Sequence, residues 1–160
     1  MKAWLLAGLL AFAAYGAAAD DIRFPPAFTP ALMVHVPRGW TSEKAQVLLS
    51  DNLLINSPDS QIVFSISLAP TLGSVDRLAA KILKQAPTGK TKTKLAGLDA
   101  FAYRGKTTNP DGVALNLTLI VAPIDPQEAF TCTLITWMED GDKRLAPARK
   151  LIADIKLIRK

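Results

Sequence analysis

Residues able to hold a metal ion or act as a catalytic base are scarce in this chain. Its 160 residues include a single histidine, His35, and a single cysteine, Cys132. One histidine excludes zinc motifs built on a histidine pair, and it makes any Ser/His/Asp or Cys/His/Asp triad depend on that residue. The sequence also has no Gly-x-Ser-x-Gly, P-loop, Gly-x-Gly-x-x-Gly or Cys-x-x-Cys motif. We therefore expect no metal, no cofactor and no catalytic site.

Cys132 and His35 each lie in an apolar run that alternates like a strand. Alternation places Cys132 on the face shared by Phe130 and Leu134, which is the core face of that strand. A buried free cysteine packs as a small hydrophobic side chain, so we interpret Cys132 as a core residue rather than a reactive thiol. In the run 32–36, His35 points away from the apolar face and toward solvent, which indicates a surface role.

Aromatic residues are also few, at 7% of the chain, and lysine and arginine outnumber aspartate and glutamate by 19 to 14. Proteins that bind single-stranded nucleic acid interleave basic residues with exposed aromatic rings. This sequence lacks that arrangement, so we expect no nucleic-acid partner. A mild excess of positive charge favours contact with anionic surfaces without requiring it.

Six basic residues form the candidate contact surface for an anionic partner. Three project from one face of an extended segment that alternates lysine and threonine, and three lie in a helical segment near the C-terminus. They are Lys90, Lys92, Lys94, Arg149, Lys150 and Lys156. A protein, a lipid headgroup and a polysaccharide are the partner classes that such a surface suits. The alternative interpretation is a solvated edge strand whose lysines protect it from aggregation.

Three carboxylates, Glu139, Asp140 and Asp142, gather just before the C-terminal helical segment. They indicate either a weak calcium loop or a polar turn in which Asp142 caps the helix. Their spacing matches no EF-hand, which favours the turn. Trp40 and Trp137 are interpreted as structural, although Trp137 would mark a binding surface if no helix covers its face.

Long apolar runs are absent after the first 19 residues. Lys2 supplies a positive charge, residues 3–14 are apolar and uncharged, and Ala17 and Ala19 form an A-x-A cleavage site. We expect residues 1–19 to be a signal peptide cleaved after Ala19, because the apolar run is shorter than the ~20 residues that span a bilayer. No cysteine lies near the cleavage site, which excludes a lipoprotein. The leader suggests a bacterial periplasmic protein with no stable membrane anchor.

Alternating apolar runs predict strands, and helical spacing of apolar residues predicts two helices. The strands and extended segments are expected over 32–36, 46–55 with a break near 51–52, 61–69, 90–95, 98–104, 113–122 and 129–138. The helices are expected over 75–86 and 145–158.

The order of these elements predicts the fold class. Residues 20–31 are rich in proline, so we expect an extended entry segment there, followed by a single domain over 32–160. Short turns between consecutive strands imply antiparallel pairing. The predicted fold is α+β, with a single antiparallel sheet of about six to seven strands packed by two amphipathic helices.

Several short motifs resemble the PsbP-like superfamily, especially its small exported bacterial members of the DcrB-like kind. They are Val36-Pro37-Arg38-Gly39-Trp40 after a strand, the helix around 78–82, the segment Leu95-Ala96-Gly97-Leu98-Asp99-Ala100, and a closing Ile-Lys-Leu-Ile. The resemblance covers about residues 32–158. It implies an accessory or binding protein rather than an enzyme, and it assigns no role to any single residue.

The sequence thus predicts an exported accessory or binding protein without enzymatic activity, with an inhibitor or immunity-type protein as one specific form. We expect a monomer with a periplasmic protein partner. A small hydrolase using His35 or the carboxylates of 139–142 is the alternative from another class. A small-ligand carrier is a third, and it would need an apolar pocket between helix and sheet.

Overall fold

The structure is a computed structural model, and it describes residues 19–47 and 50–159. Residues 1–18 of the expected signal peptide lie outside the described residues. The strands are β1 (Asp20–Phe24), β2 (Ala31–Val36), β3 (Thr41–Val47), β4 (Ser50–Asn56), β5 (Ile62–Pro70), β6 (Thr88–Leu95), β7 (Leu98–Thr108), β8 (Ala114–Pro123), β9 (Glu128–Thr136) and β10 (Lys156–Ile158). The helices are α1 (Val75–Leu83), the 3-10 helix η1 (Lys143–Leu145) and α2 (Ala146–Asp154). None of the helices in the described part of the chain has the length and apolar character of a membrane span.

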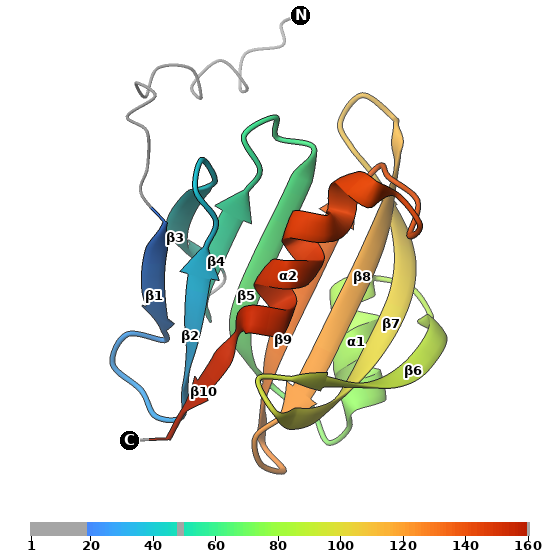
Figure 1. Ribbon diagram of the computed structural model, residues 1–160. Coiled ribbons are helices and arrows are strands. Elements are labelled where there is room, and N and C mark those ends of the chain that lie inside the picture. Colours follow the sequence, from blue (N-terminus) through green and yellow to red (C-terminus); the bar gives the residue numbers. More distant parts are fainter. Residues whose placement is uncertain (1–18, 48–49, 160) are drawn as a thin grey trace, which may run out of the picture.

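Most strands form one antiparallel sheet of seven, in the order β3-β4-β5-β9-β8-β7-β6. Every neighbouring pair in it is antiparallel, which confirms the pairing expected from the short turns. The expectation of a single sheet is wrong, however. β1, β2 and β10 form a separate three-stranded sheet, so the fold has two antiparallel sheets and two α-helices (Figure 1).

Both ends of the chain are more regular than expected, and they supply β1 and β10, the two outer strands of the three-stranded sheet. Residues 20–24 pair antiparallel with β2, although 20–31 was predicted to lack regular structure. Its prolines start only at Pro25, so they leave the backbone N–H groups of β1 free to pair. At the other end, the helix predicted over 145–158 stops at Asp154, and β10 pairs with β2. Ile155 is extended yet still buried, so apolar spacing alone did not distinguish helix from strand there.

Two other boundaries differ from the predictions. The run 46–55 with its break near 51–52 belongs to two paired strands, β3 and β4, and the connection between them at 48–49 lies outside the described residues. The first helix ends at Leu83 rather than Ala86, because Lys84 adopts the left-handed conformation (φ 54°) as its C-cap. Ser74 caps the start of α1, where its hydroxyl accepts a hydrogen bond from the Arg77 N–H at 3.2 Å.

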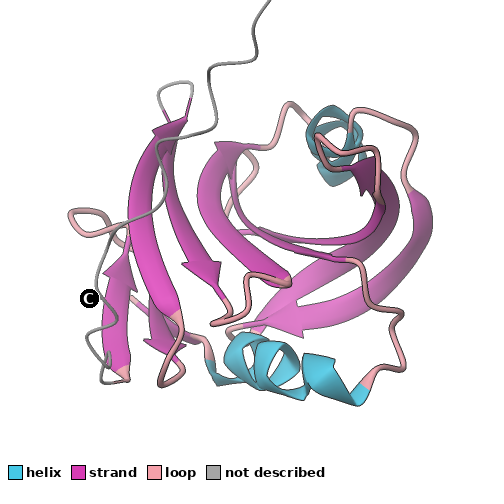
Figure 2. Ribbon diagram, turned by 90° about the horizontal axis from the view of Figure 1, so that it is seen from above, coloured by secondary structure: helices cyan, strands magenta, loops and turns pink. Residues whose placement is uncertain are grey.

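The two α-helices cover opposite faces of the seven-stranded sheet, and the view from above separates them clearly (Figure 2). α2 and the three-stranded sheet lie over what we call the front face (Figure 1), and their apolar side chains join those of the sheet in the larger core cluster. α1 lies over the back face at β7, β8 and β9, where a smaller cluster forms around Leu78, Ala79 and Leu83.

β9 is paired on both sides and runs through the middle of the sheet, between β5 and β8. Cys132 and Phe130 lie on its front face and are buried in the larger cluster. Burial raises the pKa of the Cys132 thiol well above its ordinary value. The prediction that Cys132 is a core residue is therefore confirmed.

Candidate functional site

His35 lies on the outer surface of the three-stranded sheet, as its place in the strand predicted. Its side chain is 50% exposed, and its Nδ1 lies 2.8 Å from a carboxylate oxygen of Asp21. A shallow hollow of about 370 Å³ surrounds the pair and is also lined by Met33, Asp154 and Lys156. No serine, threonine or cysteine lines this hollow, so the lining supplies no hydroxyl or thiol nucleophile for His35 to activate.

The carboxylates of residues 139–142 separate in the structure. Asp142 caps η1 by accepting a hydrogen bond from the Arg144 N–H at 2.9 Å, and it also binds the Arg144 guanidinium. These bonds hold the pKa of Asp142 down at about 2. Asp142 thus caps the short 3-10 turn that leads into α2, while α2 itself begins without a side-chain cap. Within residues 19–47 and 50–159, no group of three or more His, Cys, Asp or Glu is placed to hold a metal ion.

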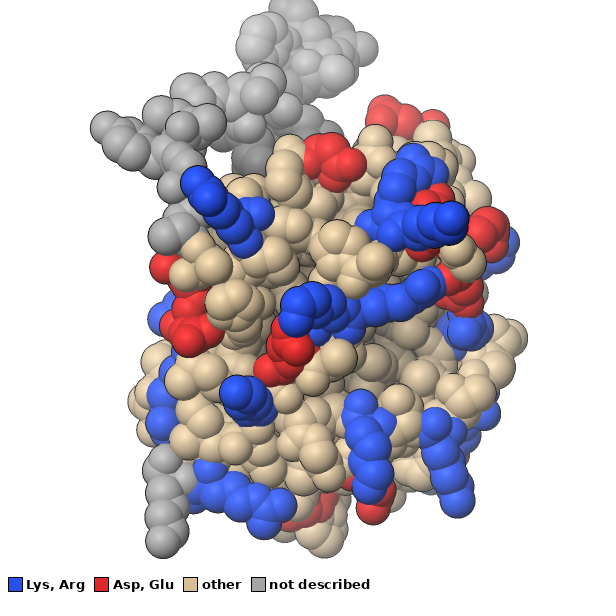
Figure 3. All heavy atoms as spheres, viewed as in Figure 1, with Lys and Arg blue, Asp and Glu red and all other residues tan. Residues whose placement is uncertain are grey.

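The six basic residues of the candidate anionic-partner surface lie in three elements: three in β6, two in α2 and one in β10. Three of them form ion pairs: Lys90 with Asp76, Lys94 with Asp99, and Lys150 with Asp154. On the face shown in Figure 3, Lys and Arg side chains lie at several separate places, with uncharged and acidic side chains between them. A common anionic-partner surface formed by Lys90, Lys92, Lys94, Arg149, Lys150 and Lys156 stays a prediction.

Lys90 forms contacts that stabilise the packing of α1, which the sequence did not indicate. Its ammonium lies 2.8 Å from Asp76 Oδ1 in the first turn of α1, and the hydroxyl of Tyr103 donates to the same oxygen at 2.6 Å. The ammonium also lies 4.4 Å from the centre of the Phe101 ring. These contacts lower the pKa of Asp76, while burial and the bond to Asp76 raise the pKa of Tyr103. We call this group the Asp76 cluster, and it fastens α1 to the back face.

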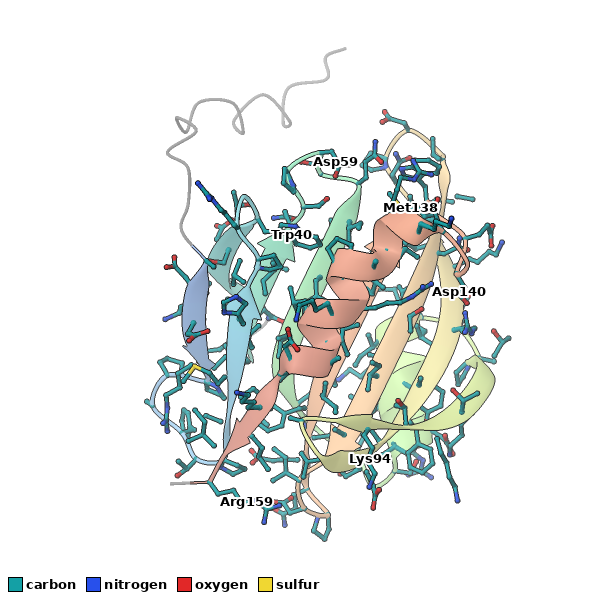
Figure 4. The ribbon with its side chains drawn as sticks, in the orientation of Figure 1. Trp40, Asp59, Lys94, Met138, Asp140 and Arg159 are labelled. Carbon is teal, nitrogen blue, oxygen red and sulfur yellow. The ribbon has the colours of Figure 1, made fainter. Side chains whose placement is uncertain are left out.

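A different feature is the best candidate for a functional site: an open groove of about 580 Å³ beside the outer part of β7. On the front face its walls come from β7, β8 and the segment between β9 and η1, where Asp140 lies over the sheet (Figure 4). The end of the α1–β6 connection completes it. The lining residues are Gln85, Ala86, Thr88, Arg104, Gly105, Lys106, Asn116, Leu117, Thr118, Glu139 and Asp140.

Polar contacts hold the wall opposite β7 in place. The Arg104 guanidinium forms an ion pair with Asp140 across the groove. The Asn116 side-chain amide donates to the Met138 carbonyl at 3.0 Å, and the Met138 N–H donates to the Thr136 hydroxyl at 3.1 Å. The segment after β9 is therefore tied to both β7 and β8. The groove has charges of both signs, and its chemistry suits hydrogen-bonded binding rather than nucleophilic attack.

Lys106 and Glu139 are the charged groups of the groove that remain without an ion-pair partner among the described residues. Both are exposed. An unpaired ammonium and an unpaired carboxylate at one groove are free to pair with charges on a bound molecule. These two residues, with Asn116 and Thr118, are the ones through which the groove can select a ligand.

The sequence alone did not reveal this groove. Asn116 and Thr118 lie on the face of β8 opposite Leu117 and Leu119, as strand alternation implies. Arg104 and Lys106 occupy the corresponding positions of β7, beside Thr118 and Asn116 respectively. A search for polar residues on the same face of two adjacent strands could have found the four. The contribution of Glu139 and Asp140 depends on a loop conformation that no local pattern indicates.

The two tryptophans divide between core and surface. Trp40 is buried in the larger cluster, as expected for a structural residue. Trp137 is 44% exposed, and the Arg144 guanidinium lies 4.6 Å from the centre of its ring. Arg144 belongs to η1, so this short 3-10 helix, and not an α-helix, contacts the ring, while part of the ring stays exposed.

No protein-family model and no curated protein sequence matches the chain. The resemblance to the PsbP-like superfamily therefore stays a prediction. Solved structures with this fold include the two that follow. A protein of Bacteroides thetaiotaomicron VPI-5482 has a TM-score of 0.55 and 16% sequence identity, over 81% of this chain. The match covers 46% of that protein, so this chain spans less than half of its length.

The second structure is LpqN of Mycobacterium tuberculosis, a protein described as involved in cell envelope biogenesis. It has a TM-score of 0.53 and 12% sequence identity, and the match covers 88% of this chain and 90% of LpqN. At these identities the two comparisons show a common fold and nothing about activity.

Proposed function

We propose that this chain is an exported accessory protein without enzymatic activity, and that it binds a protein partner in the periplasm through the groove beside β7. The observation that carries the proposal is the groove itself. It is open and carries charges of both signs, and its walls are tied together by the Arg104–Asp140 ion pair and the Asn116 bond to Met138. Mixed polar surfaces of this kind are typical of non-obligate protein interfaces.

Export is part of the proposal, and it rests on the leader predicted over residues 1–19. The description of LpqN as involved in cell envelope biogenesis is compatible with it. The PsbP-like resemblance adds the expectation of an accessory role. An inhibitor or immunity-type protein is the specific form in which such a protein would cover the active site of its partner.

The geometry favours a protein partner over a small ligand. Carriers of small molecules enclose them in concave, mainly apolar cavities. The groove described here is open to solvent, and most of its lining residues are polar or charged. An extended polar surface of a partner can reach both walls at once, which a small apolar ligand cannot do.

Site-specific photo-crosslinking in periplasmic extract tests this proposal. A photoreactive residue replacing Thr118 lies in the groove, and one replacing Ser65 lies on the opposite face of the sheet as a control, since both side chains are half-buried. We expect one protein to be captured from position 118 and not from position 65. Capture of the same proteins from both positions, or from neither across several growth conditions, contradicts the proposal.

The hydrolase alternative is tested separately with His35→Ala. His35 lies outside the groove. We expect the variant to retain the crosslink from position 118 in full. If His35→Ala instead abolished the activity of the protein in the cell while the crosslink stayed unchanged, the hydrolase alternative would be favoured.

A further inference from the structure

We propose that the partner binds as an added β-strand along the free edge of β7 at residues 105–108, and that it places an acidic side chain against Lys106. This inference rests on the proposed function, because it names the form in which the partner enters the same groove. Pairing with an exposed strand edge is a recurring way for a protein to bind an extended peptide, in which main-chain hydrogen bonds supply much of the affinity.

The free edge arises because β6 is shorter than the strand beside it. β6 pairs with β7 from Leu95↔Leu98 to Thr88↔Arg104, whereas β8 pairs with β7 as far as Thr108↔Ala114. β8 therefore holds residues 105–108 in a regular extended conformation. No strand of the described part of the chain lies on their other side.

Two side-chain contacts show which backbone groups face the open side. The carbonyl of Arg104 accepts a hydrogen bond from the Thr88 hydroxyl at 3.0 Å, and that of Lys106 accepts one from the Gln85 side-chain amide at 3.4 Å. Both donors lie on the side away from β8. Since backbone direction alternates along a strand, Lys106 and Thr108 offer their N–H and C=O groups outward, while Gly105 and Thr107 face β8.

The Gln85 side chain, which contacts this edge in the structure, forms only a weak hydrogen bond with it. The Gln85 bond of 3.4 Å is long for an N–H···O contact, and Gln85 is an exposed side chain in the connection after α1. It can approach because Gly105 has no side chain: a Cβ there would lie 2.8 Å from Gln85 Nε2 and 3.1 Å from Leu83 Cδ2. A peptide N–H would replace this contact with a shorter, better-aligned bond.

Charge determines what kind of strand fits. Lys106 and Arg104 both project from the front face of the edge, and Lys106 has no ion-pair partner among the residues described. An acidic residue opposite Lys106 would form a favourable cross-strand pair. A second copy of this chain pairing edge to edge would instead bring these basic residues toward each other, which disfavours self-association. On the back face, Leu83 (7% exposed) and Leu117 (9% exposed) lie beside Gly105, and the small part of their side chains that stays uncovered favours an apolar residue at the next position of the peptide.

The test uses random eight-residue peptides displayed on phage, selected against the exported protein. We expect the enriched peptides to alternate acidic and apolar residues. Lys106→Glu is expected to weaken their binding at least tenfold, and Lys44→Glu to leave it within twofold. Lys44 is the matched control because it is an exposed lysine on β3, the strand at the opposite edge of the same sheet, outside both the groove and the candidate anionic-partner surface.

Backbone pairing has a separate signature in amide hydrogen exchange of the ¹⁵N-labelled protein. On addition of an enriched peptide, we expect slower exchange at the Lys106 and Thr108 amides, with Gly105 and Thr107 already protected by β8. Failure to enrich any peptide, or binding that leaves both amides unchanged, overturns the added strand. Slower exchange of the same two amides on self-association of the protein, without peptide, would identify a second copy as the occupant and also overturn it. The crosslink from position 118 does not depend on strand pairing, so its persistence would show that the proposed function survives.

Discussion

The two α-helices lie on opposite faces of one sheet, and they are held there by different means. α2 packs through Ala148 and Leu151, and Leu145 of η1 and Ile155 after its end are buried in the same larger cluster. α1 has the smaller apolar cluster and adds the Asp76 cluster, in which Tyr103 and Lys90 both bind one carboxylate. Both helices have nine residues, so the difference is that directional polar contacts help to fix the position of α1.

Truncating one buried leucine on each helix should show the largest difference between the two faces. We expect Leu151→Ala to lower the free energy of unfolding by about 3–5 kcal/mol, and Leu78→Ala to lower it by about 2–3 kcal/mol, because the smaller cluster at the outer strands can relax around a cavity. Urea unfolding with an unchanged m-value measures both. An equal or larger loss for Leu78→Ala would show that the two faces are packed alike.

The hydroxyl of Tyr103 should have an intermediate effect. Tyr103→Phe removes its bond to Asp76 and is expected to cost about 1 kcal/mol. The wild-type pKa of Tyr103 is raised in the fold, so the folded state favours the neutral phenol. The stability that follows is complete below about pH 10 and is lost as the pH rises above that value.

Chemical unfolding between pH 8 and 11 measures this dependence. The Tyr103→Phe variant should lose part of the alkaline decline that the wild type shows. An identical decline in both proteins would assign it to other groups, such as the lysines.

The smallest expected effect separates two neighbouring lysines. Lys90→Met should cost about 0.5–1 kcal/mol, because it removes a half-exposed ion pair and the contact with the Phe101 ring. Lys92→Met should stay within about 0.3 kcal/mol, as is usual for an exposed side chain without such contacts. Thermal unfolding at low and high salt compares them, and a greater loss for Lys92→Met would contradict the role given to the Asp76 cluster.

The same contrast explains what the sequence could and could not predict. Strand alternation correctly assigned Cys132, Phe130 and His35 to their faces, because one-sided burial leaves a pattern with a period of two. It could not reveal that Lys90 reaches Asp76, since that pair depends on how α1 returns across the sheet. The helix expected through Ile158 was wrong for a related reason: Ile155 remains buried whether the chain is helical or extended.

The groove could be predicted from the sequence only in part. Its strand residues, Arg104, Lys106, Asn116 and Thr118, follow a readable alternation, but their adjacency requires the register of β7 with β8. The short extent of β6, which leaves residues 105–108 without an outer neighbour, results from the bulge between Thr88 and Thr91 and the turn before it. Pro87 and Gly89 mark this turn and bulge locally, but the residues of β7 left without a partner depend on the pairing register, so the edge could be found only in the folded structure.

The position of Cys132 makes it an internal reporter on how the front face of the sheet opens. It lies on β9, the middle strand of the seven, at 1% exposure, in the core between that sheet and the layer formed by α2 and the three-stranded sheet, so fraying of β3 or β6 leaves its sulfur covered. A thiol reagent can reach it when that layer lifts from the sheet or when the middle strands separate. At a reagent concentration low enough for reclosing to be faster than modification, the labelling rate would equal the opening equilibrium constant multiplied by the rate for a free thiol. The single cysteine would then measure the stability of the packing over the front face without any denaturant.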